Sequence, residues 1–190
     1  MLRTARLSGI WAIAAAMTFG SLALEAADQP QPQALSNFQQ VSDSLCRGAQ
    51  PSAEGFRELA KMGVHTVLDL RAAGGRSSKE AELVRSLGLQ YVSIPLDGFQ
   101  APTTDEVAKI FAVFNDQTAG KIFVHCRRGA DRTGTVLAMY RIQHDHWTNQ
   151  QALNEAKSMK MASTEKLMRK FVLDYTPAAP AATATTVAAN

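Results

Sequence analysis

Ten residues, positions 125–134, decide how this chain is expected to fold: His125-Cys126-Arg127-Arg128-Gly129-Ala130-Asp131-Arg132-Thr133-Gly134. A β-rich apolar run, residues 121–125 (KIFVH), leads into them, and a helical pattern follows from Thr133 to about His144. The pattern predicts a short loop between a strand and a helix. In such a loop successive backbone N–H groups point inward and bind an anion, and the positive end of the helix adds to the same site.

The residue types in this loop suit the chemistry of phosphate esters. Gly129 permits the strained backbone that such a loop requires. The inward N–H groups stabilise a thiolate at Cys126, which can attack phosphorus and form a phosphocysteine intermediate. Arg132 offers a planar fork that can grip two phosphate oxygens, and Thr133 can hydrogen-bond the sulfur as it leaves. The expected phosphate-binding residues are Arg127, Arg128, Gly129, Ala130, Asp131 and Arg132.

The loop resembles the signature of the protein tyrosine phosphatase superfamily, His-Cys-five residues-Arg-Ser/Thr, and is most similar to its small bacterial dual-specificity branch. Three other segments resemble that group: residues 47–51 (RGAQP) its entry segment, residues 69–71 with Glu80 its Leu-Arg…Glu pair, and residues 94–97 (IPLD) its acid loop. The resemblance spans roughly residues 41–160. It implies a cysteine-dependent phosphatase. No metal or other cofactor is expected, because Arg132 and the N–H groups take the place of a cation.

The leaving group of a phosphate ester also needs a proton, and a carboxylic acid beside the cradle is the natural donor. Asp97 lies 29 positions before Cys126, which is similar to the spacing in dual-specificity phosphatases. The alternative is a turn-forming aspartate, because Asp97 precedes Gly98. Asp131 is a rival acid, since phosphoinositide phosphatases of the myotubularin type carry an aspartate at that place. We favour Asp97.

Predicted strands and helices alternate along the chain, which indicates an α/β fold with a mostly parallel central sheet flanked by helices. The expected strands are residues 64–70, 90–94 and 121–125. The expected helices cover residues 51–62, 77–87, 103–114 and 133–144, with two more beginning at Thr148 and Ser163. Ligands of such folds bind beyond the carboxyl ends of the strands. The loops after Leu70, Ile94 and His125 are therefore expected to meet.

The first 26 residues are expected to be a secretory signal peptide. Two arginines precede an apolar run from Leu7 to about Leu24, and cleavage after Ala23 or Ala26 would fit the small residues there. The alternative is an uncleaved membrane anchor, because the run is near the spanning length. We expect an exported protein, periplasmic or secreted, that contacts a membrane only if this segment is uncleaved.

The rest of the chain divides by composition. Residues 27–40 are rich in Gln and Pro and are expected to be a linker, residues 41–176 the cysteine phosphatase domain, and residues 177–190 a disordered tail. The 190 residues are 46% hydrophobic and 19% charged, as in a globular protein, with a net charge of +3. This slight basic excess suits a small anionic substrate and does not indicate nucleic-acid binding.

Several functions fit these features. The leading hypothesis is a phosphomonoester hydrolase that acts on phosphotyrosine or dual-specificity protein substrates. An inositol-phosphate or phosphoinositide phosphatase is the alternative, and export makes it more plausible, because cytoplasmic phosphoproteins are then out of reach. A rhodanese-type sulfurtransferase and an inactive phosphate-binding module are further possibilities. The partner is therefore expected to be a phosphorylated protein or a small phosphate ester.

The remaining charged residues and histidines have less specific interpretations. The side chains of Arg127 and Arg128 either add positive potential for a second phosphate or are simply solvated. Arg76 and Lys79 could line the same mouth, whereas Arg71 is expected to pair with Glu80 and hold the loop. His144 and His146 supply too few ligands for zinc and are expected to be surface residues at a helix end.

Cys46 is the second cysteine of the chain, and a buried thiol is its default interpretation. A disulfide between Cys46 and Cys126 is the alternative. It would block the nucleophile and act as a redox switch in an oxidising compartment.

Overall fold

The computed structural model describes residues 34–177, so the predicted signal peptide, half of the predicted linker and nearly all of the predicted tail lie outside the described residues. The strands form one sheet in the order β1-β2-β5-β3-β4. They are β1 (Gln39–Ser42), β2 (Leu45–Ala49), β3 (Val64–Asp69), β4 (Gln90–Ser93) and β5 (Lys121–Cys126). All neighbours pair in parallel except β1 and β2, which are antiparallel. The predicted α/β fold with a mostly parallel sheet is confirmed.

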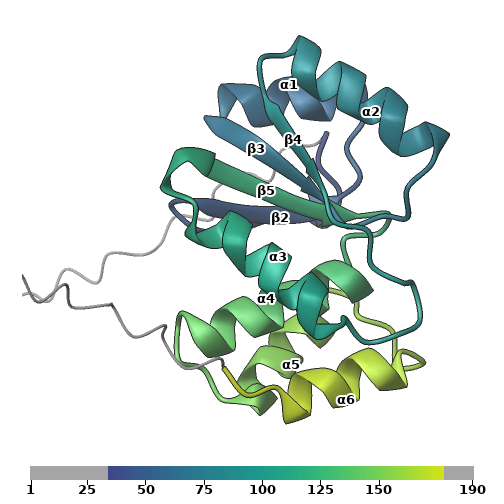
Figure 1. Cartoon of the computed structure of the whole chain (residues 1–190), viewed down its shortest axis with the longest axis vertical. Coiled ribbons are helices and arrows are strands. Elements are labelled where there is room, and N and C mark those ends of the chain that lie inside the picture. Colours follow the sequence, from purple (N-terminus) through teal and green to yellow (C-terminus); the bar gives the residue numbers. More distant parts are fainter. Residues whose placement is uncertain (1–33, 178–190) are drawn as a thin grey trace, which may run out of the picture. The chain divides into compact units, whose positions relative to one another are not determined.

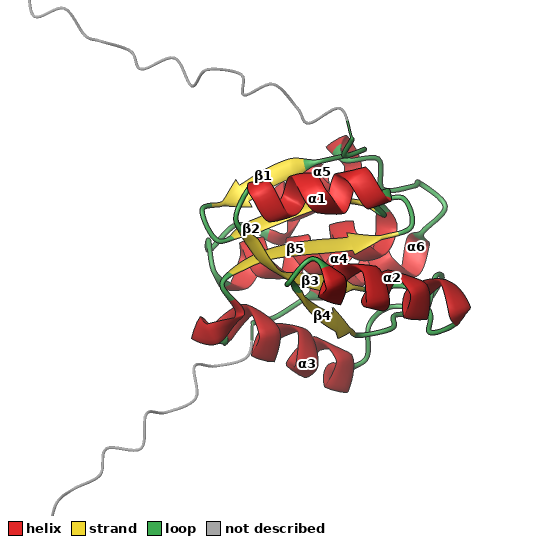
Figure 2. Cartoon of the chain, turned by 90° about the horizontal axis from the view of Figure 1, so that it is seen from above, coloured by secondary structure: helices red, strands yellow, loops and turns green. Residues whose placement is uncertain are grey.

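Helices cover both faces of this sheet (Figures 1 and 2). They are α1 (Ala53–Lys61), α2 (Gly75–Ser86), α3 (Thr104–Asn115), α4 (Asp131–Gln143), α5 (Asn149–Ser158) and α6 (Lys166–Asp174), with a short 3₁₀ turn at Gln117–Ala119. Helices α1 and α2 lie on one face, and α3 to α6 lie on the other. Within residues 34–177, no helix combines the length and the apolar character needed to cross a bilayer.

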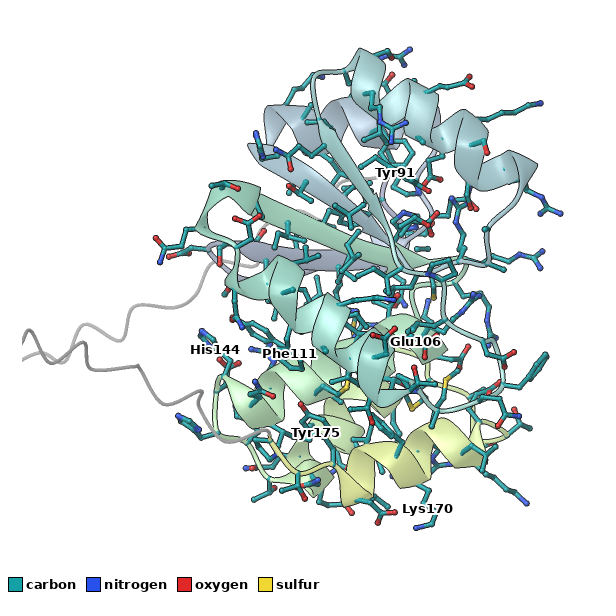
Figure 3. All side chains as sticks on the ribbon, viewed as in Figure 1. Tyr91, Glu106, Phe111, His144, Lys170 and Tyr175 are labelled. Carbon is teal, nitrogen blue, oxygen red and sulfur yellow. The ribbon has the colours of Figure 1, made fainter. Side chains whose placement is uncertain are left out.

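Each face of the sheet packs its own apolar cluster. Phe56, Leu59 and Val84 lie between the sheet and helices α1 and α2. Ile110 and Leu137 are among those that pack between the sheet and helices α3 and α4. Figure 3 shows the same division, with Tyr91 in the upper layer and Phe111 and Tyr175 in the lower one.

Local capping signals place the starts of α1, α3 and α5 correctly, whereas α4 begins at Asp131 rather than Thr133 and α6 at Lys166 rather than Ser163. Thr103 with Glu106 and Thr148 with Gln151 form capping boxes, which confirms the expected starts of α3 and α5. The expected cap of α2 at Ser77 is wrong. That helix begins at Gly75, and its N-cap Gly74 has no side chain to form a cap hydrogen bond.

Strands β1 and β2 were not among the strands expected from the sequence. Both are short, and polar Gln39 and Gln40 in β1 lack an alternating apolar pattern. The predicted linker also extends too far. Leu35 packs in the core, and Asn37 bonds to the loop after β5, so the end of that segment belongs to the domain.

Strand register brings the carboxyl ends of the parallel strands to one edge of the sheet. Ala49 pairs with Cys126, and Asp69 pairs with His125 on one side and with Ser93 on the other. The loops after β3, β4 and β5 therefore begin at the same edge, as expected.

The loop after β5 packs directly against strand β2. Gly129 has φ +65°, and a Cβ built there would lie 2.3 Å from the carbonyl carbon and oxygen of Gly48. Backbone atoms rather than flexible side chains make this contact, so they cannot move aside easily. Only glycine satisfies both the left-handed φ and this close approach.

We predict that Gly129→Ala destabilises the fold through both effects. The left-handed conformation alone costs about 1–2 kcal/mol for a residue with a Cβ, and the contact with Gly48 adds to that. Gly63→Ala is the matched control, because Gly63 has φ +79° but open space around it. Denaturant unfolding of both variants checks this. A Gly129→Ala loss no larger than the Gly63→Ala loss contradicts the steric account.

Candidate active site

The loop between β5 and α4 has its backbone donors free. Strand β5 ends at Cys126 and helix α4 begins at Asp131. Among the described residues, none of the N–H groups of residues 127–130 donates to a backbone oxygen. Gly129 and Ala130 are buried, and buried donors without a partner are uncommon in proteins. Four free donors next to a helix N-terminus form an anion-binding cradle.

Contacts behind the loop hold its carbonyls. The guanidinium of Arg47 and the side-chain amide of Asn37 both donate to the carbonyl oxygen of Gly129, the latter at 2.9 Å. Asn37 also reaches the carbonyls of Arg128 at 3.3 Å and Met159 at 3.1 Å. The loop carbonyls are therefore engaged by Asn37 and Arg47, whereas the loop amides have no backbone acceptor among the described residues.

Sequence reasoning did not assign a role to Asn37 or Arg47. Asn37 fell in the predicted linker. Arg47 belonged to the entry segment singled out by resemblance, but its contact with Gly129 joins residues 82 positions apart. No local pattern reports such a contact.

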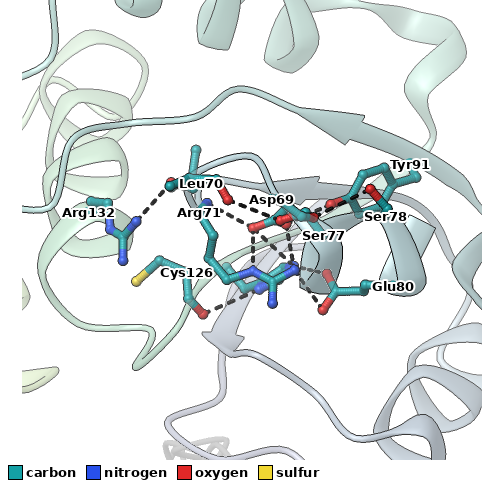
Figure 4. A network of polar contacts seen from close by, with 12 residues as sticks. Asp69, Leu70, Arg71, Ser77, Ser78, Glu80, Tyr91, Cys126 and Arg132 are labelled. Carbon is teal, nitrogen blue, oxygen red and sulfur yellow. Dashed lines mark hydrogen bonds and ion pairs between the residues drawn. The ribbon is translucent and has the colours of Figure 1, made fainter.

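Cys126 and Arg132 take the places that the sequence predicts for them. Cys126 is buried at the end of β5, and its residue exposure is 2%. Arg132 is half-buried in the first turn of α4, where one guanidinium nitrogen donates to the carbonyl of Leu70 at 3.3 Å (Figure 4). The loops after β3 and β5 are thereby joined at the cradle.

Thr133 is fully buried in the first turn of α4. Within the described part of the chain its hydroxyl has no hydrogen-bond partner, so the predicted bond to the Cys126 sulfur is not formed in this structure. A buried hydroxyl without a partner is costly. The Thr133 hydroxyl is therefore available to a group that the reaction brings into reach.

Asp97 lies in the exposed loop after β4. Its carboxylate accepts hydrogen bonds from the backbone N–H groups of Phe99 at 2.7 Å and Gln100 at 2.8 Å. These two bonds, and then the charge of Arg132, lower the pKa of Asp97. The hydrogen bonds also give the carboxylate the turn-forming geometry that was the alternative interpretation.

Asp131, the rival acid, is buried and has both oxygens engaged. One oxygen pairs with Arg128, and the other accepts the backbone N–H of Ala162 at 2.9 Å. Asp131 thereby ties the cradle to the segment after α5. Its neighbour Arg128 is directed to this contact, whereas Arg127 lines the pocket described below.

A buried polar network lies beneath the cradle (Figure 4). Arg71 donates two hydrogen bonds to Asp69, at 2.8 and 2.6 Å, and forms an ion pair with Glu80 at 2.9 Å. Tyr91 donates to Asp69 at 2.6 Å, and Nε2 of His125 lies 3.0 Å from Glu80. The expected pairing of Arg71 with Glu80 is confirmed. The network fixes the end of β3 against α2 and the residue preceding Cys126.

The charges of this network explain why it can stay buried. Burial alone would raise the pKa of Asp69, but the hydrogen bonds from Arg71, the charge of His125 and the bond from Tyr91 outweigh burial and lower it. In the described residues, Asp69, Glu80 and His125 form a cluster with the spacing of metal ligands. Arg71 already pairs with both carboxylates, so a metal ion in the same place would be repelled by the guanidinium.

A pocket of about 300 Å³ opens beside the cradle. It is lined mainly by the backbone around the start of α2 and by the side chains of Gln50, Arg71, Arg76, Arg127 and Arg132. Arg76 therefore lies at the mouth as expected, whereas Lys79 is not part of the lining. Among the described residues, Arg76, Arg127 and Arg132 form no ion pair with a carboxylate.

The two cysteines do not lie close enough to form a disulfide. Cys46 pairs with Phe123, whereas Cys126 pairs with Ala49, three residues further along the same two strands. That offset alone separates them by roughly 10 Å, beyond the reach of a disulfide. Both thiols are free, and burial raises the pKa of Cys46 to about 12. The redox-switch alternative is wrong, and the buried-thiol interpretation of Cys46 is confirmed.

His144 and His146 are exposed residues at and beyond the end of α4, as expected. His144 stacks on Tyr140, with ring centroids 4.7 Å apart. In the described part of the chain, neither histidine belongs to a cluster with metal-ligand spacing.

Comparison with known proteins places this geometry in a family. The chain is 29% identical over 119 residues to the dual specificity protein phosphatase TpbA of Pseudomonas aeruginosa, covering 63% of this chain and 52% of TpbA. The chain thus spans about half the length of that relative. The crystal structure of TpbA with phosphotyrosine has a TM-score of 0.54 at 19% identity, covering 76% of this chain and 99% of the other.

A second solved structure shares the fold. The catalytic core of the PP-IP phosphatase SIW14 from S. cerevisiae has a TM-score of 0.67 at 19% identity, covering 75% of this chain and 87% of the other. A sequence model described as "DSP-PTPase phosphatase fused to NAD+ kinase" matches residues 28–173. Because this match spans most of the chain, the protein belongs to that dual-specificity-like family within the protein tyrosine phosphatase superfamily.

Proposed function

We propose that the chain hydrolyses phosphomonoesters through a phosphocysteine intermediate at Cys126. The observation that carries this proposal is that, among the described residues, the N–H groups of residues 127–130 have no backbone acceptor in a loop that lies between Cys126 and Arg132. In the first step the Cys126 thiolate attacks phosphorus, the bond from phosphorus to the ester oxygen breaks, and that oxygen takes up a proton. In the second step water attacks phosphorus, the bond to sulfur breaks, and inorganic phosphate leaves.

The proposed roles of the other residues follow from their positions. Arg132 and the loop amides neutralise the phosphoryl oxygens in both transition states. Asp97 supplies the proton to the leaving oxygen, since both oxygens of Asp131 are engaged in holding the loop. Both amides of Phe99 and Gln100 donate to Oδ1 of Asp97, so Oδ2 is the oxygen that would carry the proton.

The proposed substrate is a phosphorylated protein, either one that carries phosphotyrosine or one of the kind that dual-specificity phosphatases act on. Membership of the family supports this, and TpbA has been crystallised with phosphotyrosine. Phe99, on the Asp97 loop, is 75% exposed and offers an aromatic surface to a tyrosine ring or a peptide.

The arginine-lined pocket favours a second candidate, a substrate with more than one phosphate, such as an inositol phosphate. Arg76 and Arg127 lie beside Arg132, and no carboxylate of the described residues pairs with them, so a second phosphate could bind there. The PP-IP phosphatase SIW14 shares the fold, which is compatible with this candidate.

We propose that the protein is exported, periplasmic or secreted. The supporting feature is the apolar run after Arg3 and Arg6. It lies outside the described residues. Amino-terminal sequencing of the protein from the cell envelope tests this, and an intact Met1 on membrane-bound protein would favour an anchor.

Cys126→Ser is predicted to lower turnover of an aryl phosphate by on the order of 10⁴-fold or more, because the nucleophile is lost. Phosphate affinity should remain, since the loop amides are unchanged. Steady-state kinetics and phosphate-binding calorimetry check both expectations.

Parental turnover in the serine variant would exclude Cys126 as the nucleophile, and thiosulfate–cyanide transfer by the parental protein would favour a sulfurtransferase. An inactive binding module would bind phosphate without any turnover.

Asp97→Asn is predicted to slow alkyl phosphates by on the order of 10²–10⁴-fold, because an alkoxide leaves poorly without a proton. Nitrophenyl phosphate should slow clearly less. The pKa of Asp97 is lowered, so its protonated form is lost at a lower pH than for an ordinary aspartate. Parental activity on alkyl phosphates should therefore already decrease in the acidic range as pH rises. This decrease should be absent in Asp97→Asn.

Asp131→Asn is the matched comparison for the acid. Because Asp131 holds the loop, its variant should slow good and poor leaving groups alike and lower the free energy of unfolding. If Asp131→Asn shows the leaving-group dependence and Asp97→Asn does not, the acid belongs in the cradle.

Arg76→Met tests the second candidate function. Removing one charge-assisted contact should lower kcat/KM for an inositol bisphosphate relative to an aryl phosphate by about 10–100-fold. Arg169→Met, on the exposed side of α6, is the control and should leave that ratio unchanged. A ratio unaffected by Arg76→Met argues that the pocket binds no second phosphate.

A further inference from the structure

Arg47 is a charged residue inside the sheet. It lies in β2 opposite Val124 of β5, with no exposed surface. Side chains alternate between the faces of a strand, so Arg47 shares a face with Leu45. Leu45, Val124 and Cys126 pack in the same apolar cluster beneath α4. The guanidinium and the thiol are therefore on the same buried face, behind the cradle.

One nitrogen of the Arg47 guanidinium has a hydrogen-bond partner. Nη2 donates to the carbonyl of Gly129. Within the described part of the chain, Nε and Nη1 have no partner, and no carboxylate forms an ion pair with Arg47. Glu155 is the carboxylate whose charge acts most on Arg47. It already accepts hydrogen bonds from Arg141 at 3.0 and 2.8 Å and from Gln39 at 3.1 Å.

An uncompensated buried cation is unfavourable. Burial lowers the pKa of Arg47 to about 10, and the charges of Glu155 and Cys126 counteract part of that shift. Electrostatic coupling is mutual, so a cation that gains from a negative charge at Cys126 also favours that negative charge. The buried position strengthens the coupling, because water does not screen it.

We propose that Arg47 is a positioning residue that holds the Gly129 carbonyl behind the cradle and, through its buried charge, favours the thiolate of Cys126. The inference rests on the proposed role of Cys126 as nucleophile. Strand β2, through Arg47, thereby acts on the nucleophile, which the sequence of the loop itself does not indicate. The thiolate is stabilised from the open side by the loop amides and from the buried side by Arg47.

The other charges around Cys126 are paired or lie on the open side. Those on the elements packed against it are Asp69 of β3 with Arg71 after it, Asp97 after β4, His125 of β5, Arg127, Arg128, Asp131, Arg132 and Arg141 in the cradle and α4, and Glu155 on α5. Arg71, Arg128 and Arg141 pair with carboxylates, and Nε2 of His125 lies 3.0 Å from Glu80. Arg127 and Arg132 line the pocket on the open side, so among the described residues Arg47 is the cation without a carboxylate partner that lies behind the nucleophile.

The test is a titration of the Cys126 thiolate by its ultraviolet absorbance, as the difference between each protein and its Cys126→Ser counterpart. This difference cancels Cys46 and the tyrosines. Arg47→Lys keeps the charge, whereas Arg47→Gln keeps a donor without charge. Losing the cation makes the thiolate less favourable, so the Arg47→Gln midpoint should rise by about one pH unit. Arg47→Lys should stay near the parental midpoint.

Val172→Ala is the control for destabilisation, because Val172 is fully buried in the distant cluster of α4, α5 and α6. It should lower the free energy of unfolding without moving the midpoint. An Arg47→Gln midpoint equal to the parental one overturns the proposal, and so does an Arg47→Lys midpoint that rises as far. If Arg47→Gln does not fold, Arg47→Met takes its place. The Arg47→Met midpoint should then rise, and the Arg47→Lys midpoint should stay near the parental one.

The titration needs no turnover, so its failure and the failure of the proposed function are distinguishable. If Cys126→Ser keeps parental turnover while the Arg47 variants shift the thiolate titration, the proposed function fails and the coupling stands. If turnover is lost in Cys126→Ser but the midpoints do not move, the coupling fails and the proposed function stands.

Discussion

The close approach of Gly129 to the backbone of Gly48 constrains the whole site. Only a glycine at φ +65° fits against β2, and this contact turns the loop carbonyl toward Arg47 and Asn37. The amides of residues 127–130 are then left without backbone acceptors in the described chain. An anion-binding cradle thus follows from a steric constraint at the sheet, and Cys126 and Arg132 acquire their chemistry from it.

Two layers of buried charge support this cradle. On one face of the sheet, Arg71 pairs with both Asp69 and Glu80, and Nε2 of His125 lies 3.0 Å from Glu80, so the buried carboxylates that join β3 to α2 are paired. On the other face, Arg47 has no carboxylate partner within residues 34–177. The first arrangement stabilises structure. The second leaves a buried positive charge that the negative charge of a thiolate or a bound phosphate can stabilise.

Local patterns in the sequence predicted the local features of the fold. The strand at residues 121–126, the loop and α4 are contiguous, so Cys126 and Arg132 could be assigned from spacing alone. Contacts between distant segments were not readable. Asn37 lay in a predicted linker, and the engagement of Asp131 depends on Ala162, 31 positions away. Strands β1 and β2 are short and, in β1, polar, and their pairing is set by tertiary contacts.

The central claim is that the cradle holds a phosphoryl group on the Cys126 sulfur. The most direct measurement is mass spectrometry of acid-quenched protein after mixing Asp97→Asn with an aryl phosphate in excess. The account predicts one added phosphoryl group on the peptide that contains Cys126, and none after Cys126→Ser. Turnover without this adduct at any quench time, or an adduct on another residue, would contradict it.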